Sequence, residues 1–191
     1  ATSRAMFAID PETNTTRWVY RGGVIPHSAI AMKDGRVFFL ESKDTQSTQG
    51  RVDLATMRNS GLQLVSLDAA SGREVWREEL TNVKWEHSVY LSCSQDAIIL
   101  IGSHNENEQN RYSIGVYDAD RGAHRWSAEH NNNRAGIGGD HGEQVHHPVV
   151  FDDFVVAEPL IYDLASGDVI DPTQRNGFSI RSRSGCGTIS G

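Results

Sequence analysis

Three histidines stand sixty residues apart, each directly in front of an apolar segment: His27, His87 and His147. If these segments are equivalent strands of a repeated fold, the three side chains converge on one place. Imidazole nitrogens that converge from separate strands can hold a divalent transition ion or carry protons in catalysis. The same spacing also suits histidines that only hydrogen-bond neighbouring turns, and the sequence leaves both interpretations open.

A dense polar segment, residues 138–147, leads into the third of these strands. It holds three histidines and two acidic residues, among them His146, His147 and Glu143. Its glycines let the backbone approach a ligand closely. We therefore predict that His146 can join the metal set and that Glu143 can act as a general base. A solvated loop without such a role is the alternative.

The fourth equivalent position holds a thiol, Cys186, where an inner strand is predicted to start. The predicted metal ligands are therefore His27, His87, His146, His147 and Cys186. Cys93 alternates with apolar residues, which predicts an inert buried thiol, and a disulfide between the two cysteines cannot be read from the sequence. Three arginines can recognise an anion near the same place or serve as ordinary surface residues: Arg134, Arg181 and Arg183.

The elements that must position these residues follow from an internal repeat. Four segments share an apolar run, an Asp, and a Gly or Asn four residues later; the aspartates are Asp10, Asp68, Asp118 and Asp163. Their spacings are 58, 50 and 45 residues. An apolar run, a turn and a second short run predict a β-hairpin. The Asp can accept turn N–H groups, and the Gly or Asn stands where positive φ is needed.

A tryptophan follows eight residues after the Asp in the first three units: Trp18, Trp76 and Trp126. The fourth unit has Asp171 there instead. We predict that each tryptophan is largely buried between adjacent units and donates its indole N–H to an acceptor.

A second recurring piece lies between the hairpins and consists of a strand, an Asp-containing turn and another strand. The second strands are apolar on both faces, as a sheet stacked between two others requires. Four-stranded units at this period predict a β-propeller. The outer hairpins are expected at about residues 5–21, 62–80, 113–130 and 158–171, with the inner pairs between them and a short helix at 53–59.

Composition excludes two classes of protein. With 18 Lys and Arg against 25 Asp and Glu, the net charge is −7, and no basic run provides the cationic face of a nucleic-acid binder. The longest apolar runs are about five residues, far short of the roughly 20 that span a bilayer. We therefore expect no nucleic-acid partner and no membrane span.

The units resemble the repeat of the PQQ-binding-like (quinoprotein) β-propeller superfamily, whose repeat ends in Leu-Asp-x-x-x-Gly-x-x-x-Trp. Residues 67–76 match it fully and 117–126 nearly so, 9–18 have Asn for Gly, and 162–171 lack the Trp. The resemblance implies an all-β fold, with residues 1–191 forming one propeller region of about four blades. Propellers of this superfamily usually have seven or eight blades, so this region is expected to be part of a larger propeller. A small closed ring, or two half-rings that associate, are the alternatives.

The resemblance further implies an exported bacterial protein, periplasmic or on the cell surface. Three functions are open: a ligand- or partner-binding scaffold with a His-rich site at the channel mouth, a metal-dependent lyase-like carbohydrate-active enzyme, or a PQQ-dependent dehydrogenase. In the lyase-like case Gln144 would join the histidines around the ion. Quinoprotein dehydrogenases stack a vicinal Cys-Cys disulfide on PQQ, and this chain has no such pair.

A divalent transition metal is therefore the expected cofactor, and PQQ is not. The expected partners are missing blades of the same propeller or a second chain, together with a carbohydrate or protein ligand.

Overall fold

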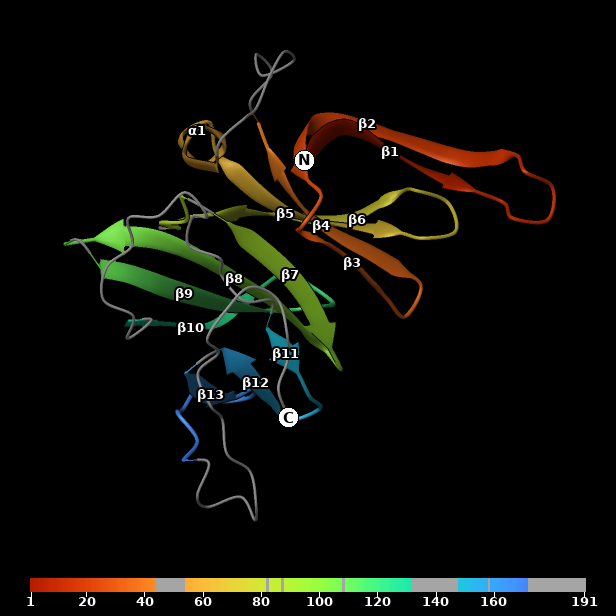
Figure 1. The fold of residues 1–191 in the computed structure, drawn as a ribbon. Coiled ribbons are helices and arrows are strands. Elements are labelled where there is room, and N and C mark those ends of the chain that lie inside the picture. Colours follow the sequence, from red (N-terminus) through yellow and green to blue (C-terminus); the bar gives the residue numbers. More distant parts are fainter. Residues whose placement is uncertain are drawn as a thin grey trace.

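The computed structural model describes residues 1–43, 54–81, 83–86, 88–107, 109–131, 148–157 and 159–171. Its strands form antiparallel sheets that stack one on another (Figure 1). The stack begins with the first hairpin, made of β1 (Thr2–Ile9) and β2 (Thr16–Pro26). The end of β2 also pairs with the next unit through Val24 and Ser42, so the first hairpin and that unit are joined in one hydrogen-bonded sheet.

Two complete four-stranded sheets follow the first hairpin. Blade 1 contains β3 (Ile30–Lys33), β4 (Arg36–Ser42), β5 (Leu62–Asp68) and β6 (Glu74–Leu80), with the short helix α1 (Leu54–Asn59) between β4 and β5. Blade 2 contains β7 (Val89–Ser94), β8 (Ala97–Glu106), β9 (Gln109–Asp118) and β10 (His124–Asn131). The predicted short helix is confirmed.

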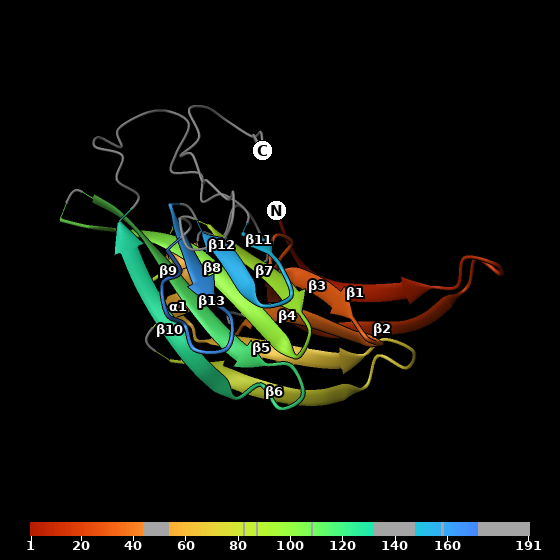
Figure 2. The same ribbon diagram turned by 90° about the horizontal axis from the view of Figure 1, so that it is seen from below.

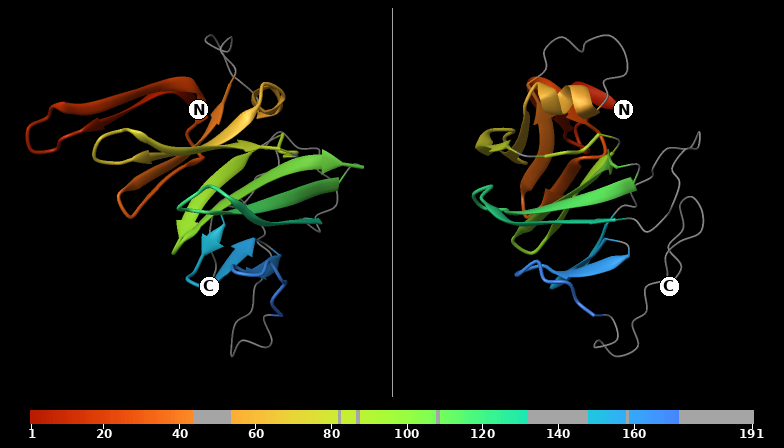
Figure 3. Two further views of the ribbon diagram at one scale, coloured as in Figure 1. Left: turned by 180° about the vertical axis from the view of Figure 1, so that it is seen from behind. Right: turned by 90° about the vertical axis from the view of Figure 1, so that its left-hand side faces the viewer.

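Blade 3 is described over three strands: β11 (Val149–Val150), β12 (Phe154–Ala157) and β13 (Leu160–Asp163). A bridge between Tyr162 and Val169 marks where its fourth strand would begin. Seen from behind and from the side, the units keep the order first hairpin, blade 1, blade 2, blade 3 (Figure 3).

The first strands of the blades lie next to one another along one side of the stack. Strands β3, β7 and β11 are neighbours in this row (Figure 2). The backbone N–H of Leu91 donates to the carbonyl of Ser28 at 3.3 Å. The Ser94 hydroxyl donates to the carbonyl of Phe151 at 2.8 Å. These bonds join blade 1 to blade 2 and blade 2 to blade 3.

Apolar layers fill the space between successive units. Side chains of β4 alternate: Phe38 and Leu40 pack toward blade 2, while Val37 and Phe39 pack toward the first hairpin. Strand β8 repeats this pattern, with Ile98 facing blade 1 and Ile99 facing blade 3. The prediction that second strands are apolar on both faces is confirmed for blades 1 and 2, because each of these blades lies between two other described units.

The hairpin turns adopt the conformation that the repeat predicts. The residue four after each Asp has positive φ: Asn14 (53°), Gly72 (69°), Gly122 (74°) and Gly167 (79°). Each Asp carboxylate accepts backbone N–H bonds from its own turn, as Asp118 does from residues 120 and 121 at 2.9 and 3.0 Å. The local chemistry of the turn thus accounts for the repeat.

The blades have two distinct ends. At the turn end, the turn between the third and fourth strands bonds to the turn between the first and second; the N–H of Ala119 donates to the carbonyl of Asp96 at 2.8 Å. At the opposite connection end, chain segments cross from one blade to the next. The chain is therefore an all-β protein of propeller-type blades, as predicted. No helix among the described residues is long and apolar enough to cross a membrane.

Candidate functional site

Of the predicted site residues, the structure describes His27. This side chain is exposed, and it follows β2 directly and precedes β3, the first strand of blade 1. The other predicted residues lie outside the described ranges: His87, Arg134, Glu143, Gln144, His146, His147, Arg181, Arg183 and Cys186. Within those ranges no group of three His, Cys, Asp or Glu side chains could hold a metal ion. The metal set and the Glu143 base therefore stay predictions.

Polar groups that the sequence analysis did not single out gather at the connection end of blade 2. The segment that crosses from β6 to β7 packs along the end of β8. The N–H of Glu86 donates to the carbonyl of Ser103 at 2.8 Å, and the N–H of Ser103 donates to the carbonyl of Ser88 at 3.2 Å. These bonds hold the crossing segment against the end of β8 in blade 2.

Four buried polar atoms at this end have no hydrogen-bond partner among the described residues: Ser88 Oγ, Ser103 Oγ, His104 Nε2 and Arg111 Nε. Both Ser103 and His104 belong to β8 and are buried. The other nitrogen of His104, Nδ1, lies 3.4 Å from the hydroxyl of Ser113. Most buried polar atoms in proteins are hydrogen-bonded, so four such atoms without a bond to any described residue set this end of blade 2 apart.

A ring of alternating charges borders these atoms. Lys84 lies 3.2 Å from Glu129 and 4.0 Å from Glu106, while Arg111 lies 2.6 Å from Glu106 and 4.0 Å from Glu129. The two cations and two carboxylates balance one another. Burial lowers the pKa of the nearby His104 imidazole below its usual value, because a desolvated ring favours the neutral form.

A pocket of about 370 Å³ lies beside this charge ring, between the crossing segment and strands β9 and β10. Its lining combines aromatic, hydroxyl and charged side chains: Thr81, Val83, Lys84, Trp85, Ser113, Ile114, Gly115, Tyr117, His124, Ser127, Ala128 and Glu129.

Two of the aromatic side chains are fixed in the wall of this pocket. The indole of Trp85 is buried and donates to the carbonyl of Ser113 at 3.3 Å. Burial raises the pKa of Tyr117 to about 12, which keeps its phenol neutral. His124 is exposed, lies edge-on to Tyr117 at 5.4 Å between ring centroids, and bonds Ser127 at 2.6 Å. The two rings thus form a buried part of the wall, while His124 and Ser127 are exposed.

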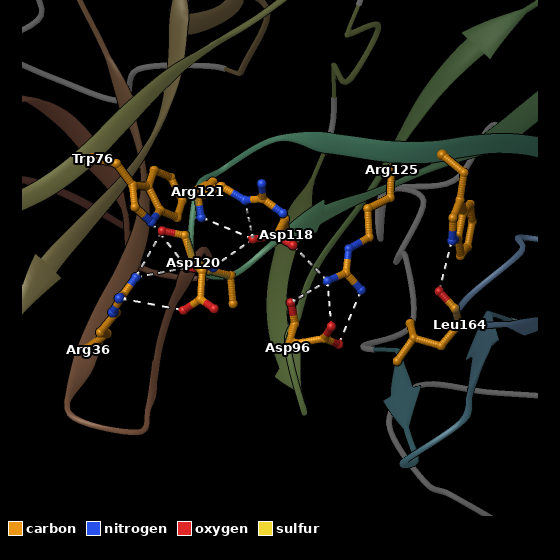
Figure 4. A network of polar contacts seen from close by, with 10 residues as sticks. Arg36, Trp76, Asp96, Asp118, Asp120, Arg121, Arg125 and Leu164 are labelled. Carbon is orange, nitrogen blue, oxygen red and sulfur yellow. Dashed lines mark hydrogen bonds and ion pairs between the residues drawn. The ribbon is translucent and has the colours of Figure 1, made fainter.

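At the turn end, the three tryptophans link successive units in one geometry. The indole N–H of Trp18 donates to the Ala69 carbonyl at 2.9 Å. Trp76 and Trp126 donate in the same way to the carbonyls of Ala119 and Leu164, at 3.1 and 2.9 Å (Figure 4). Each acceptor is the residue after the turn Asp of the next unit. The prediction that the indole N–H groups find acceptors is confirmed.

Each tryptophan ring also lies over the turn glycine of the next unit. A Cβ added to Gly122 would lie 2.8 Å from the ring of Trp76. The prediction that these rings are largely buried is only partly right, because all three are half-buried. They lie on or beside the outermost strands, where the next turn covers one face of each ring.

Arginines add charged bonds at the turn end. Arg36 reaches from blade 1 to the Ala119 carbonyl of blade 2 at 3.1 Å. Within blade 2, Arg125 binds Asp96 at 2.7 Å and Asp118 at 2.9 Å (Figure 4). The Arg125 guanidinium lowers the pKa of both carboxyl groups, since a cation nearby favours the charged form.

Cys93 lies on β7, in the row of first strands, and is half-buried rather than fully buried. Burial raises the pKa of its thiol to about 12. A neutral thiol is a weak nucleophile, which agrees with the predicted inert character.

The described blades have the stacked, four-stranded form of a β-propeller. Their repeated turn contacts are those that the resemblance to quinoprotein-type repeats predicts. A scan against protein-family models finds no match, and a search of curated protein sequences finds none either.

Among solved structures, the chain is similar to BamB from Moraxella catarrhalis, with 17% identity and a TM-score of 0.47, over 82% of this chain and 40% of that one. It is also similar to quinohemoprotein alcohol dehydrogenase from Comamonas testosteroni, with 20% identity and a TM-score of 0.43, over 65% of this chain and 18% of that one. The chain thus spans less than half the length of either protein.

Proposed function

We propose that the protein is an extracytoplasmic propeller scaffold that binds a protein partner at the connection end of its blades. The observation that supports this most is the group of four buried polar atoms beside the pocket of blade 2 that have no hydrogen-bond partner among the described residues. A buried polar atom without a partner costs about 1–3 kcal/mol. A partner that supplies hydrogen bonds there recovers part of that free energy, so binding is favoured at this end.

The charges indicate what kind of group fits. Lys84 and Arg111 are already compensated by Glu106 and Glu129. The site therefore offers hydrogen bonds and apolar contacts rather than a net charge. An extended backbone segment of a partner, with alternating N–H and carbonyl groups, matches this chemistry. A sugar hydroxyl would use the same bonds, and the experiment below separates the two.

The proposal includes a divalent transition metal at the mouth of the channel. Its ligands would be His27, His87, His146, His147 and Cys186, and Glu143 would be the base of any reaction there. The position of His27 in front of the first strand of blade 1 supports this part. So does the hydrogen bond between Leu91 and Ser28, which brings neighbouring first strands together.

Site-directed photo-crosslinking tests the binding proposal. A photoreactive residue is placed at position 127, which lines the pocket, and at position 121, which is exposed at the turn end. In bacteria that export the protein, we expect discrete protein adducts from position 127 and none from position 121. Equal crosslinking at both positions would contradict the proposal. A sugar ligand would instead give no protein adduct and a glycan shift in native mass spectrometry.

Metal analysis of the purified chain tests the metal part. We expect about one divalent transition ion for each chain, and loss of most of it in His27→Ala and His87→Ala. The matched control is His124→Ala, because His124 is an exposed histidine on the outermost strand of blade 2. A metal content that all three variants leave unchanged would rule out this ligand set.

A further inference from the structure

The outward face of the first hairpin carries large apolar side chains that no described residue covers. Phe7, Ile9 and Val19 are 61%, 48% and 49% exposed. Phe7 and Val19 are direct partners in the register of β1 and β2, so they form one patch. A contiguous exposed apolar patch on a sheet face indicates an interaction surface.

The other units show what normally covers this face. The residue directly before the turn Asp is Ile9 in the first hairpin and Leu67, Tyr117 and Tyr162 in the three blades. In the blades these side chains are only 0%, 6% and 2% exposed, because each packs against the preceding unit. The patch on the first hairpin therefore occupies the position at which a preceding propeller-type sheet would dock.

The turn of the first hairpin restricts which sheet can dock there. At the three observed junctions, a Cβ on the turn glycine would lie 2.5–2.8 Å from the docked tryptophan ring. The first hairpin has Asn14 at this position, and its Cβ occupies the space that the ring would need. The partner sheet must therefore lack the tryptophan.

One unit of this chain meets that requirement. The bridge between Tyr162 and Val169 is equivalent to the pair Tyr117 and His124 of blade 2, which places Asp171 where blade 2 has Trp126. Asp171 is exposed. Its carboxylate accepts hydrogen bonds, whereas the side-chain amide of Asn14 donates them. At the other junctions the preceding unit donates through its indole N–H and the turn of the next unit accepts. At this junction the preceding unit would accept through Asp171, and the turn would donate through Asn14.

The first hairpin and blade 3 lie at opposite ends of the stack, so the two surfaces do not meet within one molecule as described (Figures 1 and 3). We propose that the outward face of the first hairpin binds blade 3 of a second copy of the chain, with Asn14 of one copy against Asp171 of the other. Such a contact is head-to-tail, and it forms a closed ring or an open filament according to the rotation between copies. It does not depend on the proposed connection-end site.

Sedimentation velocity of the full chain over a wide concentration range tests the proposal. We expect concentration-dependent association, weakened at least about 30-fold by Phe7→Lys combined with Val19→Lys, as for residues that dominate an interface. The control is Met32→Lys, because Met32 is a 70% exposed apolar residue on β3. A chain that stays monomeric at all concentrations, or an association that Met32→Lys weakens equally, would overturn the proposal.

A second set of variants tests the junction itself. Asn14→Gly clears the space for a tryptophan, and Asp171→Trp supplies one. Each single change should weaken association, since each removes half of the amide–carboxylate pair. The double variant should associate at least as tightly as the natural chain, because it installs the contact seen at the other three junctions. Additive weakening in the double variant would refute the assignment of Asp171 to this junction.

Discussion

At the turn end of the blades, one set of hydrogen bonds recurs at three junctions. At the connection end of blade 2, ion pairs lie beside buried atoms that have no hydrogen-bond partner among the described residues. At the turn end of the described chain, the Trp, Asp and Gly residues of the repeat form the contacts between successive units. The connection end holds Ser103 and His104, buried polar residues with atoms that no described residue satisfies. The regular hydrogen bonds join successive units, and the atoms at the connection end are the ones for which a binding partner is proposed.

The largest effect is expected from Trp76→Ala at the turn end. This change removes an indole that lies over Gly122 and donates to the Ala119 carbonyl. Because the ring is half-buried, the loss should be about 3 kcal/mol of unfolding free energy, at the lower end for Trp→Ala changes. Urea denaturation measures it. A loss of less than about 1 kcal/mol would mean that docking does not hold the blades together.

A smaller effect is expected from Gly122→Ala, with Gly35→Ala as its matched control. Both glycines have nearly the same positive φ, 74° and 72°, so alanine at either position costs about the same backbone strain, about 1 kcal/mol. Only at Gly122 would the new Cβ meet a tryptophan; at Gly35 nothing lies within 4 Å. Gly122→Ala should therefore lose about 1 kcal/mol more than Gly35→Ala. Equal losses would contradict the close contact with the ring.

The two ends should also lose stability in different pH windows. His104 has a pKa lowered from 6.5 by burial, so its contribution is intact above about pH 6.5 and is lost as the pH falls through the lowered value. Asp118 has a pKa lowered from 3.8 by Arg125, so its contribution is intact above about pH 4 and is lost below it. In both cases the unfolded chain binds the proton first.

Denaturation at pH 7, 5.5 and 3.5 checks these windows. His104→Gln should flatten the change between pH 7 and 5.5 and leave the change at lower pH in place. Asp118→Asn should do the reverse. If His104→Gln leaves the upper window unchanged, another group is responsible and the burial of His104 carries no pH dependence.

The smallest signal is expected from Cys93 in the row of first strands. With a pKa of about 12, its thiolate fraction near neutral pH is lower than that of a free thiol by a factor on the order of 1000. In a Cys186→Ser background, a bulky thiol reagent should leave the native chain almost unmodified and should label it fully in denaturant. Rapid labelling of the native chain would mean that β7 opens.

The fold could be predicted because its signal is local. An Asp that accepts the N–H groups of its own turn and a Gly four residues later at positive φ need no tertiary contact, and Asp68 with Gly72 shows both. The second strands are continuous apolar runs, and such a run indicates by itself that both faces of the strand are buried. The half-burial of Trp76 was not predictable, since it depends on how much of the ring the next turn covers.

The connection-end site could not be predicted in this way. Ser88 lies directly before β7, Ser103 lies in the second half of β8, and Arg111 lies near the start of β9. Their proximity exists only in the folded blade. Two weak signals were present: Trp85 falls outside the hairpin pattern, and Ser103 and His104 follow the longest apolar run after a single glycine. Neither signal recurs along the sequence at the spacing of the repeat, so neither predicts a pocket.

The docked tryptophans have a spectroscopic consequence. Each indole belongs to one unit and its acceptor carbonyl to the next, as with Trp18 and Ala69. The emission of each ring therefore changes when a junction opens, even if the blades on both sides stay folded. Variants that keep only Trp18, Trp76 or Trp126 would turn three successive junctions into three separate optical probes, and their order of response would map how the stack comes apart.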